Sequence, residues 1–527
     1  MRGGFGSVAL TVAALTLTSR IIGFGRSVVF SKTVGDTCLG DVYHAANTLP
    51  NVAFEIVAGG VLAGVVVPVL ARHLSGDRKD AAAQTASALI TWTLLILTPA
   101  AVAAFALARL YAEAFAKPAC VGSASIIAAL LIMFVPQIWL YGLAVVTAGI
   151  LQAQHRFLAS AAGPLFSSAV VITAYVIFAT GDPAGRRNVA ELSETSVAVL
   201  GWGTTLGVLA LTLTTAIPAL GSGLRLRPRL RFATGDRSVI IRIAAAGVAG
   251  LIMQQLSVVL IIWSAQRGGD PGALTRFTWA NAIYLLPYAV LVAPLLQMIF
   301  PRLSAAAGTG AVELRAVLTE ISGPVTVLAG LGAALLGATA FPVARIFVLG
   351  PGSGRTAALA WPIIAFAPAV IGFALLGLAS RTLLAQRQAR SAGLATVSAW
   401  GVVILAVLAL RPVVPAGWLV PTLGASVSLG MIAGAAVGWV LLGRVVRPRL
   451  AKTLSVALVA AAASGTLVGW FAEGLARVSL AVAVGGAVVA TLACIVVFGG
   501  VVLVADRAAL MQVWDLRRGI RNGSAEP

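Results

Sequence analysis

Long apolar runs, separated by short polar or basic segments, extend along the whole of this chain. Most of them reach the roughly 20 apolar residues that an α-helix needs to cross a hydrocarbon core about 30 Å thick. The pattern therefore predicts an all-α integral membrane protein with about fourteen transmembrane helices. Their expected bounds are 6–31, 41–72, 82–111, 123–153, 158–180, 194–220, 238–265, 274–304, 315–348, 356–386, 391–411, 418–443, 453–473 and 477–505.

The composition agrees with this pattern. Hydrophobic residues occupy 59% of the 527 positions and charged residues only 10%. Soluble domains carry about 25% charged residues, so the composition excludes a soluble globular protein. A net charge of +20 would indicate a nucleic-acid ligand in a soluble chain. In a membrane protein, cationic residues instead gather in cytoplasmic loops and orient the helices, and we expect no nucleic-acid partner.

The basic residues lie in alternate loops. With the N-terminus inside the cell, the segments 72–79, 225–237, 444–452 and 507–521 all fall in the cytoplasm, whereas the opposite loops mix charges of both signs. This asymmetry predicts a multi-pass membrane protein with both termini in the cytoplasm.

Cysteine and histidine are rare. Three residues of each kind, scattered along the chain, are too few for a metal centre of the usual kind, and we expect no cofactor. Cys38 and Cys120 both fall on the predicted outer face, where a disulfide is permitted. Two separate thiols are the interpretation that we favour from the sequence, with a bridge between them as the alternative.

An internal repeat divides the chain. Phe134-Val-Pro136 recurs as Phe366-Ala-Pro368, displaced by 232 positions, and further matches share this register. Each copy holds six predicted helices, an even number, so both copies cross the membrane in the same sense. This predicts two parallel six-helix lobes related by a pseudo-two-fold axis along the membrane normal, as in rocker-type transporters. The expected parts are an N-terminal lobe 1–221, a basic cytoplasmic linker 222–237, a C-terminal lobe 238–446, two additional transmembrane helices 447–505 and a basic cytoplasmic tail 506–527.

Polar residues inside the membrane mark the candidate site, because a charge there is costly unless it faces a cavity or a partner. Arg20 and Arg26 lie in the first predicted helix. The second helix carries polar residues at steps of three, three, four and four, which places them on one face: Asp41, His44, Asn47, Asn51 and Glu55.

We predict that these two helices present a cationic, substrate-binding strip toward the outside of the first lobe. One alternative is that Asp41 and Glu55 neutralise both arginines and merely hold the helices together; another is snorkelling to the membrane surface. Asn281, on the eighth helix, is a weaker candidate that more often serves as an interhelical hydrogen-bond partner. Enzymatic constellations and nucleotide-binding motifs are absent from the sequence, so we expect a transporter and not an enzyme.

Three motifs resemble those of a known family: Ser19-Arg20-x-x-Gly23-Phe24-x-Arg26, Asp41-x8-Pro50-Asn51 and Val67-Pro68-x-Leu70. They are similar to the MurJ (MviN) family of lipid II flippases, within the multidrug/oligosaccharidyl-lipid/polysaccharide transporter superfamily. The resemblance implies a central cavity in which Arg20, Arg26 and Asp41 bind the diphosphate of an undecaprenyl-linked muropeptide. It also implies the bacterial plasma membrane as the location, with membrane lipids and cell-wall synthesis proteins as partners. Because no nucleotide-binding motif is present, we expect any energy coupling to come from the membrane potential or a monovalent ion.

The chain departs from the family pattern in two places. Phe54 and Glu55 stand where many members carry a pair of arginines, and Asn281-Ala282 precede Pro287 where members often carry Asp-Arg. These departures leave three other functions open. They are export of another polyprenyl-linked glycan, multidrug or cation antiport, and a non-transporting scaffold for envelope synthesis.

Overall fold

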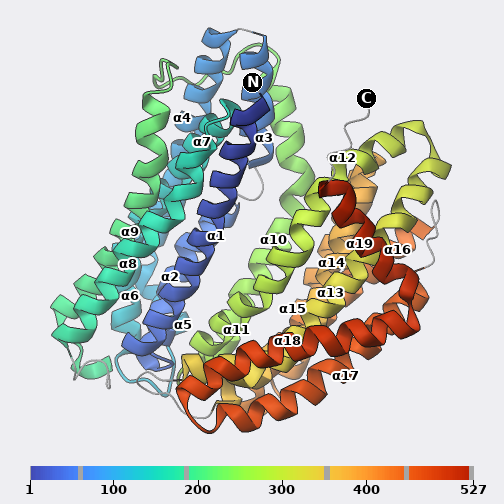
Figure 1. Cartoon of the computed structure of the whole chain (residues 1–527). Helices are drawn as coiled ribbons and strands as arrows, with labels where there is room; N and C mark the ends of the chain where they lie inside the picture. Colours follow the sequence, from blue (N-terminus) through green and yellow to red (C-terminus); the bar gives the residue numbers. More distant parts are fainter. Residues whose placement is uncertain are drawn as a thin grey trace. The chain divides into compact units, whose positions relative to one another are not determined.

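The computed structural model describes residues 2–56, 63–76, 78–182, 189–348, 356–443 and 450–521. The regular secondary structure of these residues consists of helices alone (Figure 1), which confirms the all-α prediction. They form two compact units. Unit 1 contains the described residues up to Gln255 together with the short segment Asp270–Thr275, and unit 2 contains the others. The lobe boundaries that the repeat predicts stay a prediction.

Unit 1 is a helix bundle. Its helices are α1 (Arg2–Thr33), α2 (Cys38–Glu55), α3 (Ala63–Ser75), α4 (Lys79–Ala106), α5 (Ala108–Phe115), α6 (Ser123–Phe134), α7 (Pro136–Ala153), α8 (Phe157–Gly181), α9 (Glu194–Leu220) and the first part of α10 (Asp236–Gly268). Helix α1 lies along α8, and α8 lies along α9. Helix α7 packs against both α4 and α9, while α2 packs against α6.

Unit 2 contains the end of α10 and the helices that follow it. These are α11 (Ala273–Pro287), a π-helical turn (Tyr288–Val292), α12 (Ala293–Thr309), α13 (Ala311–Phe347), α14 (Ala357–Ala385), α15 (Ala389–Leu410), α16 (Leu419–Gly443), α17 (Ala451–Ala476), α18 (Leu480–Ala505) and α19 (Arg507–Arg521). Helix α13 packs against α14 and α17, and α17 packs against α18. Part of the predicted cytoplasmic tail thus forms α19, which packs against α13.

The packing repeats as the sequence does. Helices α7 and α8 both pack against α9 in unit 1, and their counterparts α14 and α15 both pack against α16 in unit 2. One local difference separates the copies. Pro136 opens α7 after a break at Val135, whereas the equivalent Pro368 lies inside the continuous α14.

Twelve helical stretches of the described residues are long and apolar enough to cross a membrane. The other two of the fourteen predicted spans correspond to α1, and to α2 with α3; the polar face of α2 lowers its hydropathy. Many exposed side chains on the spans are apolar, such as Ile217 on α9, Trp470 on α17 and Val504 on α18. Helices that bury one side against their neighbours and expose apolar side chains on the other suit a lipid surrounding.

Candidate functional site

A short turn connects α1, which ends at Thr33, to α2, which begins at Cys38. The backbone N–H groups of Val34 and Gly35 both bond the carbonyl of Phe30 at 2.9 Å, which closes the end of α1. Gly35 has φ +76°, a left-handed conformation that glycine adopts without strain. Thr37 then caps α2, because its hydroxyl accepts the N–H of Gly40 at 3.2 Å.

The predicted polar stripe of α2 is graded in exposure. Asp41, at its beginning, is fully buried. His44, Asn47 and Asn51 are partly exposed, and Glu55 at the end of the helix is exposed. On α1, Arg20 is exposed and Arg26 is partly buried. The stripe is therefore closed at the end that contains Asp41 and accessible toward Glu55.

An aromatic cluster surrounds the Asp41 end of the stripe. The ring of Phe30 on α1 lies 5.2 Å from Tyr43, 4.9 Å from His44 and 5.2 Å from Tyr175 on α8, measured between ring centroids. The Tyr43 hydroxyl is hydrogen-bonded to the hydroxyls of Tyr175 at 2.9 Å and Thr204 at 2.7 Å. These contacts tie α1, α2, α8 and α9 together at one level.

Arg26 lies beside this cluster, one helical turn before Phe30, and its charge acts on His44 and on Tyr141 of α7. Phe54, which replaces an arginine of the family pattern, packs its ring 4.6 Å from that of Tyr141. The surroundings of the polar stripe in unit 1 therefore combine the guanidinium group of Arg26 with the aromatic rings of Phe54 and Tyr141.

Several polar groups of this site have no partner within the described residues. Neither Arg20, Arg26 nor Glu55 belongs to an ion pair there. The buried atoms Nε2 of His44 and Oδ1 of Asn47 likewise form no hydrogen bond with the described part of the chain. Buried polar atoms are usually paired with protein or water, so these two atoms are positioned for a water molecule or a ligand.

Asp41 differs from the rest of the stripe, because its carboxylate is already engaged by other residues. Its Oδ1 accepts the backbone N–H and the hydroxyl of Thr275 at 3.0 and 3.1 Å. Its Oδ2 accepts the N–H of Gly272 at 2.9 Å and lies 3.0 Å from Nζ of Lys117. Both oxygens are occupied and shielded from solvent, and the carboxylate caps the first turn of α11. The substrate-binding role of Asp41 stays a prediction.

This contact joins equivalent points of the two repeat copies. Gly272 and Thr275 follow Asp41 by 231 and 234 positions, close to the repeat spacing of 232. The beginning of α2 and the beginning of α11 therefore meet. Lys117 strengthens the junction, since its Nζ also donates to the carbonyl of Asp270 at 2.8 Å.

Cys38 and Cys120 form a disulfide, with 5.7 Å between their Cα atoms. The sequence interpretation that we favoured, two separate thiols, is therefore wrong. The bridge ties the beginning of α2 to the segment that follows α5, next to Lys117. The disulfide and the ion pair of Lys117 with Asp41 therefore stabilise the same region of unit 1, at the beginning of α2.

The predicted residue of the second copy, Asn281, lies on α11 in unit 2, where its side chain is partly exposed. Sequence analysis missed an arginine in the same unit. Arg381 on α14 donates to the carbonyl of Gly377 at 3.1 Å and is hydrogen-bonded to the hydroxyl of Tyr288. The π-helical turn that begins at Tyr288 is a feature often found at functional sites, but no sequence signal announces it.

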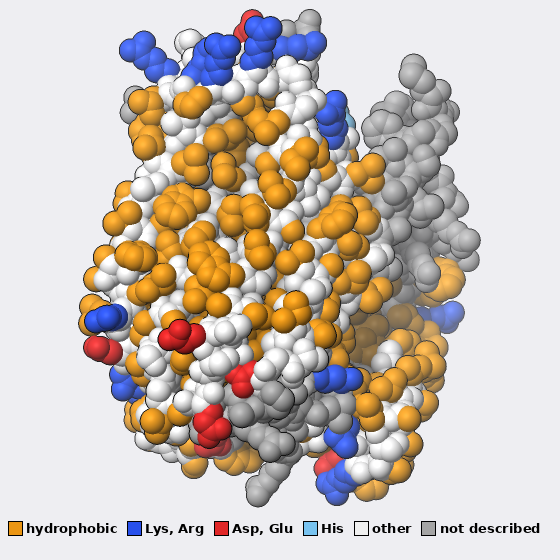
Figure 2. Space-filling view, turned by 90° about the vertical axis from the view of Figure 1, so that its left-hand side faces the viewer, with side chains coloured by type: hydrophobic (Ala, Val, Ile, Leu, Met, Phe, Trp, Pro, Cys, Tyr) orange, Lys and Arg blue, Asp and Glu red, His pale blue; other side chains and the backbone are white. Residues whose placement is uncertain are grey.

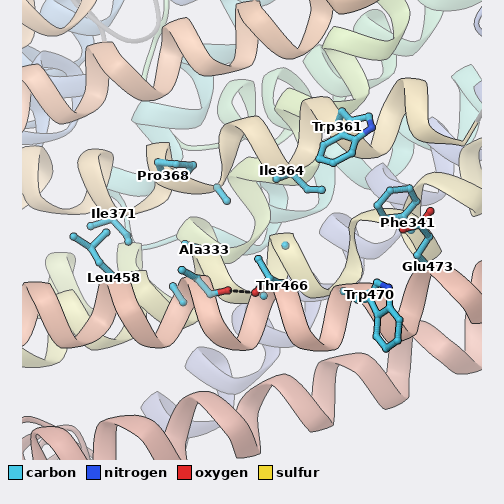
Figure 3. Close-up of a pocket in the computed structure, with 16 residues that line it drawn as sticks. Ala333, Phe341, Trp361, Ile364, Pro368, Ile371, Leu458, Thr466, Trp470 and Glu473 are labelled. Atoms are coloured by element: carbon cyan, nitrogen blue, oxygen red, sulfur yellow. Dashed lines mark hydrogen bonds between the residues drawn. The ribbon is translucent and has the colours of Figure 1, made fainter.

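Unit 2 also contains an apolar cavity of about 430 Å³ among α13, α14 and α17 (Figure 3). Phe341, Trp361, Ile364 and Trp470 are among its lining residues, and Glu473 is the one charged residue in the lining. The cavity contains none of the predicted site residues and no arginine. Its lining suits a hydrocarbon group and not a diphosphate.

A family model described as lipid II flippase MurJ matches residues 30–497. The chain belongs to the MurJ family. The probable lipid II flippase MurJ of Rhizobium tropici is 26% identical over 313 residues, which cover 58% of this chain and 56% of that protein. The match thus spans just over half the length of this curated relative.

Solved structures share the fold. A lipid II flippase MurJ in an inward closed conformation aligns over 95% of this chain and 100% of its own, with a TM-score of 0.72 at 15% identity. An inward-facing multidrug resistance MATE family transporter of the MOP superfamily aligns over 85% of this chain and 99% of its own, with a TM-score of 0.64 at 13% identity. These likenesses confirm the fold, and the family model confirms the resemblance that the motifs indicated.

Proposed function

We propose that this MurJ family member moves an undecaprenyl-diphosphate-linked peptidoglycan precursor, lipid II, from the inner to the outer leaflet of the plasma membrane. The polar head of such a lipid cannot cross hydrocarbon unaided, because each charge and amide would lose its hydration without a new partner. A polar strip inside a two-lobed transporter offers the head a route, while alternating access opens it to one side at a time.

Arg20 and Arg26 would bind the diphosphate. The observation that carries this assignment is that both guanidinium groups lie on a membrane helix without an ion pair in the described part of the chain. A guanidinium group stays charged and binds phosphate oxygens through two parallel N–H donors. The two groups lie six residues apart on α1.

The partly exposed residues of α2 would contact the sugars and the peptide. His44 and Asn47 carry the unpartnered buried atoms, and Asn51 and Glu55 extend the polar surface toward the open end. Asn281 stays a further predicted substrate contact. Asp41 has no place in substrate binding in this proposal, because its carboxylate is engaged by Lys117 and by the first turn of α11.

Transport would be driven by the membrane potential or by a monovalent ion, since the sequence contains no nucleotide-binding motif. Both termini would lie in the cytoplasm, and cell-wall synthesis proteins would be the partners that supply and consume the substrate.

The test is a bacterial strain in which the native gene is depleted and variants are supplied in trans. The wild-type chain should restore growth and prevent accumulation of lipid-linked precursor in the inner leaflet. Arg20→Ala should fail on both counts at normal protein abundance, whereas Arg109→Ala, an exposed arginine of α5, should behave as wild type. Normal precursor distribution in the depleted strain would refute the proposal.

Glu55 favours a second candidate, a cation antiporter or an exporter of another polyprenyl-linked glycan. It is an exposed acid on a polar membrane helix, without an ion pair among the described residues, and antiporters bind cations through such acids. Glu55→Gln should leave lipid II transport largely intact. If it instead abolishes cation-coupled efflux in vesicles while precursor distribution stays normal, the antiporter assignment is the correct one.

A further inference from the structure

The segment Leu224–Phe232, which we call the strap, follows α9 and alternates between apolar residues and arginine. It has no helical structure, and an extended backbone directs successive side chains to opposite sides. Leu224, Leu226 and Phe232 accordingly pack into the core formed with α3, α4 and α7. The four arginines of the strap are all exposed: Arg225, Arg227, Arg229 and Arg231.

Side chains of α4 hold the strap in place. The N–H of Arg227 donates to the hydroxyl of Ser87, and that of Arg229 to the hydroxyl of Thr91, each at 3.1 Å. The indole of Trp92 donates to the carbonyl of Leu230 at 2.9 Å. Gln84 donates to the carbonyls that follow, at 3.2 and 3.3 Å. The predicted linker is therefore fixed to unit 1, and its arginines have defined positions.

A cavity of about 420 Å³ lies among the strap, α4, α7 and α9. Its size is that of a site for a small molecule or a lipid chain. The walls are mainly apolar, with leucine the most frequent residue, and all three helices contribute to them. They include Leu94, Leu95, Leu143, Ala216 and Leu220, and Arg227 is the one charged residue of the lining. A shallower cavity beside it is lined by Leu95, Leu230 and the arginines 229 and 231.

The location matches a membrane interface. On this side of unit 1, Lys and Arg side chains gather at one end, above a broad apolar surface (Figure 2). Trp92 and Leu95 on α4 and Leu230 on the strap are 40%, 49% and 58% exposed. Exposed tryptophan next to arginine is typical of the level at which lipid headgroups lie.

We propose that the strap and the cavity bind an anionic phospholipid of the adjacent leaflet, which the predicted orientation makes the cytoplasmic one. The headgroup phosphate lies on Arg227 and Arg229, and one acyl chain fills the cavity below. Charge complementarity selects the lipid: neither cavity is lined by an acidic residue, and guanidinium groups bind phosphate oxygens bidentately. The bound lipid joins α4, α7, α9 and the strap. This site is independent of the proposed transport function.

The experiment uses the full chain in detergent, titrated with phosphatidylglycerol or phosphatidylcholine. Native mass spectrometry counts the retained lipids, and the thermal unfolding midpoint reports their effect. Two variants address the two halves of the site: Arg227→Gln with Arg229→Gln removes the phosphate contacts, and Ala216→Phe fills the cavity. The matched loss of charge in unit 2 is Arg387→Gln with Arg390→Gln. Both arginines are exposed; Arg387 lies between α14 and α15, and Arg390 lies in the first turn of α15.

Phosphatidylglycerol should bind the wild-type chain at least about tenfold more tightly than phosphatidylcholine and raise the unfolding midpoint. The strap variant should lose this preference, and the cavity variant should lose retention of the lipid. The control variant should keep both. Retention of phosphatidylglycerol by both site variants at the wild-type level would overturn the proposal. Equal stabilisation by glycerol 3-phosphate alone would also overturn it, because the acyl chain would then contribute nothing.

Discussion

Asp41 and Lys117 form an ion pair from which solvent is excluded: Oδ2 lies 3.0 Å from Nζ, and the side chains are 0% and 1% exposed. The same carboxylate caps the first turn of α11. A substrate would have to displace both partners to reach it. The buried carboxylate of Asp41 thus joins the beginnings of two equivalent helices, α2 and α11.

Breaking this pair should reduce protein stability. Lys117→Met leaves a buried carboxylate without its counter-charge, which costs about 3–5 kcal/mol. We expect the abundance of Lys117→Met in the membrane to fall, as measured by immunoblot, and its unfolding midpoint in detergent to drop. The double variant Asp41→Asn with Lys117→Met should recover part of the loss, since no charge is then stranded. Normal abundance of Asp41→Asn combined with loss of transport would instead return Asp41 to the substrate site.

Arg20 should show the opposite behaviour. Arg20→Ala removes a guanidinium group that has no ion-pair partner among the described residues, so abundance should stay normal. Activity in the complementation assay should fall about tenfold or more, which corresponds to one lost charged hydrogen bond. Arg20→Lys should recover little, because a point charge cannot reproduce the bidentate contact.

The structural alternative for Arg20 predicts a different result. If Arg20 instead paired with Glu55, Arg20→Ala would lower abundance, and Arg20→Ala with Glu55→Ala would restore it. Full activity of Arg20→Ala at normal abundance would contradict the diphosphate assignment. Arg26→Ala should cause a similar but smaller loss of activity.

Water access should rise along α2. Single cysteines at Asn47, Asn51 and Glu55 should all react with a water-soluble maleimide. The reaction should be fastest at Glu55, which is exposed, whereas Asn47 and Asn51 are partly exposed. A cysteine at Ala46, which is buried, is the matched control and should not react. The native cysteines add little background, because Cys38 and Cys120 are bridged and Cys494 is buried. Equal protection at all three polar positions would show that the stripe is sealed between helices.

The sequence predicted those features that depend on local periodicity. The length of the apolar runs gave the helical spans, and the three- and four-residue steps from Asp41 to Glu55 placed the polar stripe on one face of α2. The six-helix repeat follows from anchors such as Pro136 and Pro368. Each of these signals lies within one helix or in a direct match between two segments.

The features that the sequence could not predict depend on distant partners. Nothing near Asp41 indicates that Lys117 and Thr275 would occupy its carboxylate. Nothing in the sequence around Ser87 and Thr91 indicates that their hydroxyls would accept hydrogen bonds from the backbone of the strap. A polar side chain has the same sequence signature whether it binds substrate or caps a helix. Only the geometry separates the two roles.

The disulfide between Cys38 and Cys120 should stabilise unit 1, and the predicted orientation places it outside the cytoplasm. It closes a sequence separation of 82 residues, and a crosslink across a loop of that size typically contributes about 2–4 kcal/mol, mainly by restricting the unfolded chain. Cys120→Ser should therefore lower the unfolding midpoint in detergent, and dithiothreitol should do the same to the wild-type chain but not to the variant. A Cys494→Ser variant, which removes the unbridged cysteine, controls for loss of a thiol.

Disulfides persist in oxidising compartments, so a maleimide of high mass should label Cys38 and Cys120 in intact cells only after reduction. Labelling without reduction would mean that the bond does not form in the cell, and the ion pair of Asp41 with Lys117 would then hold this corner alone.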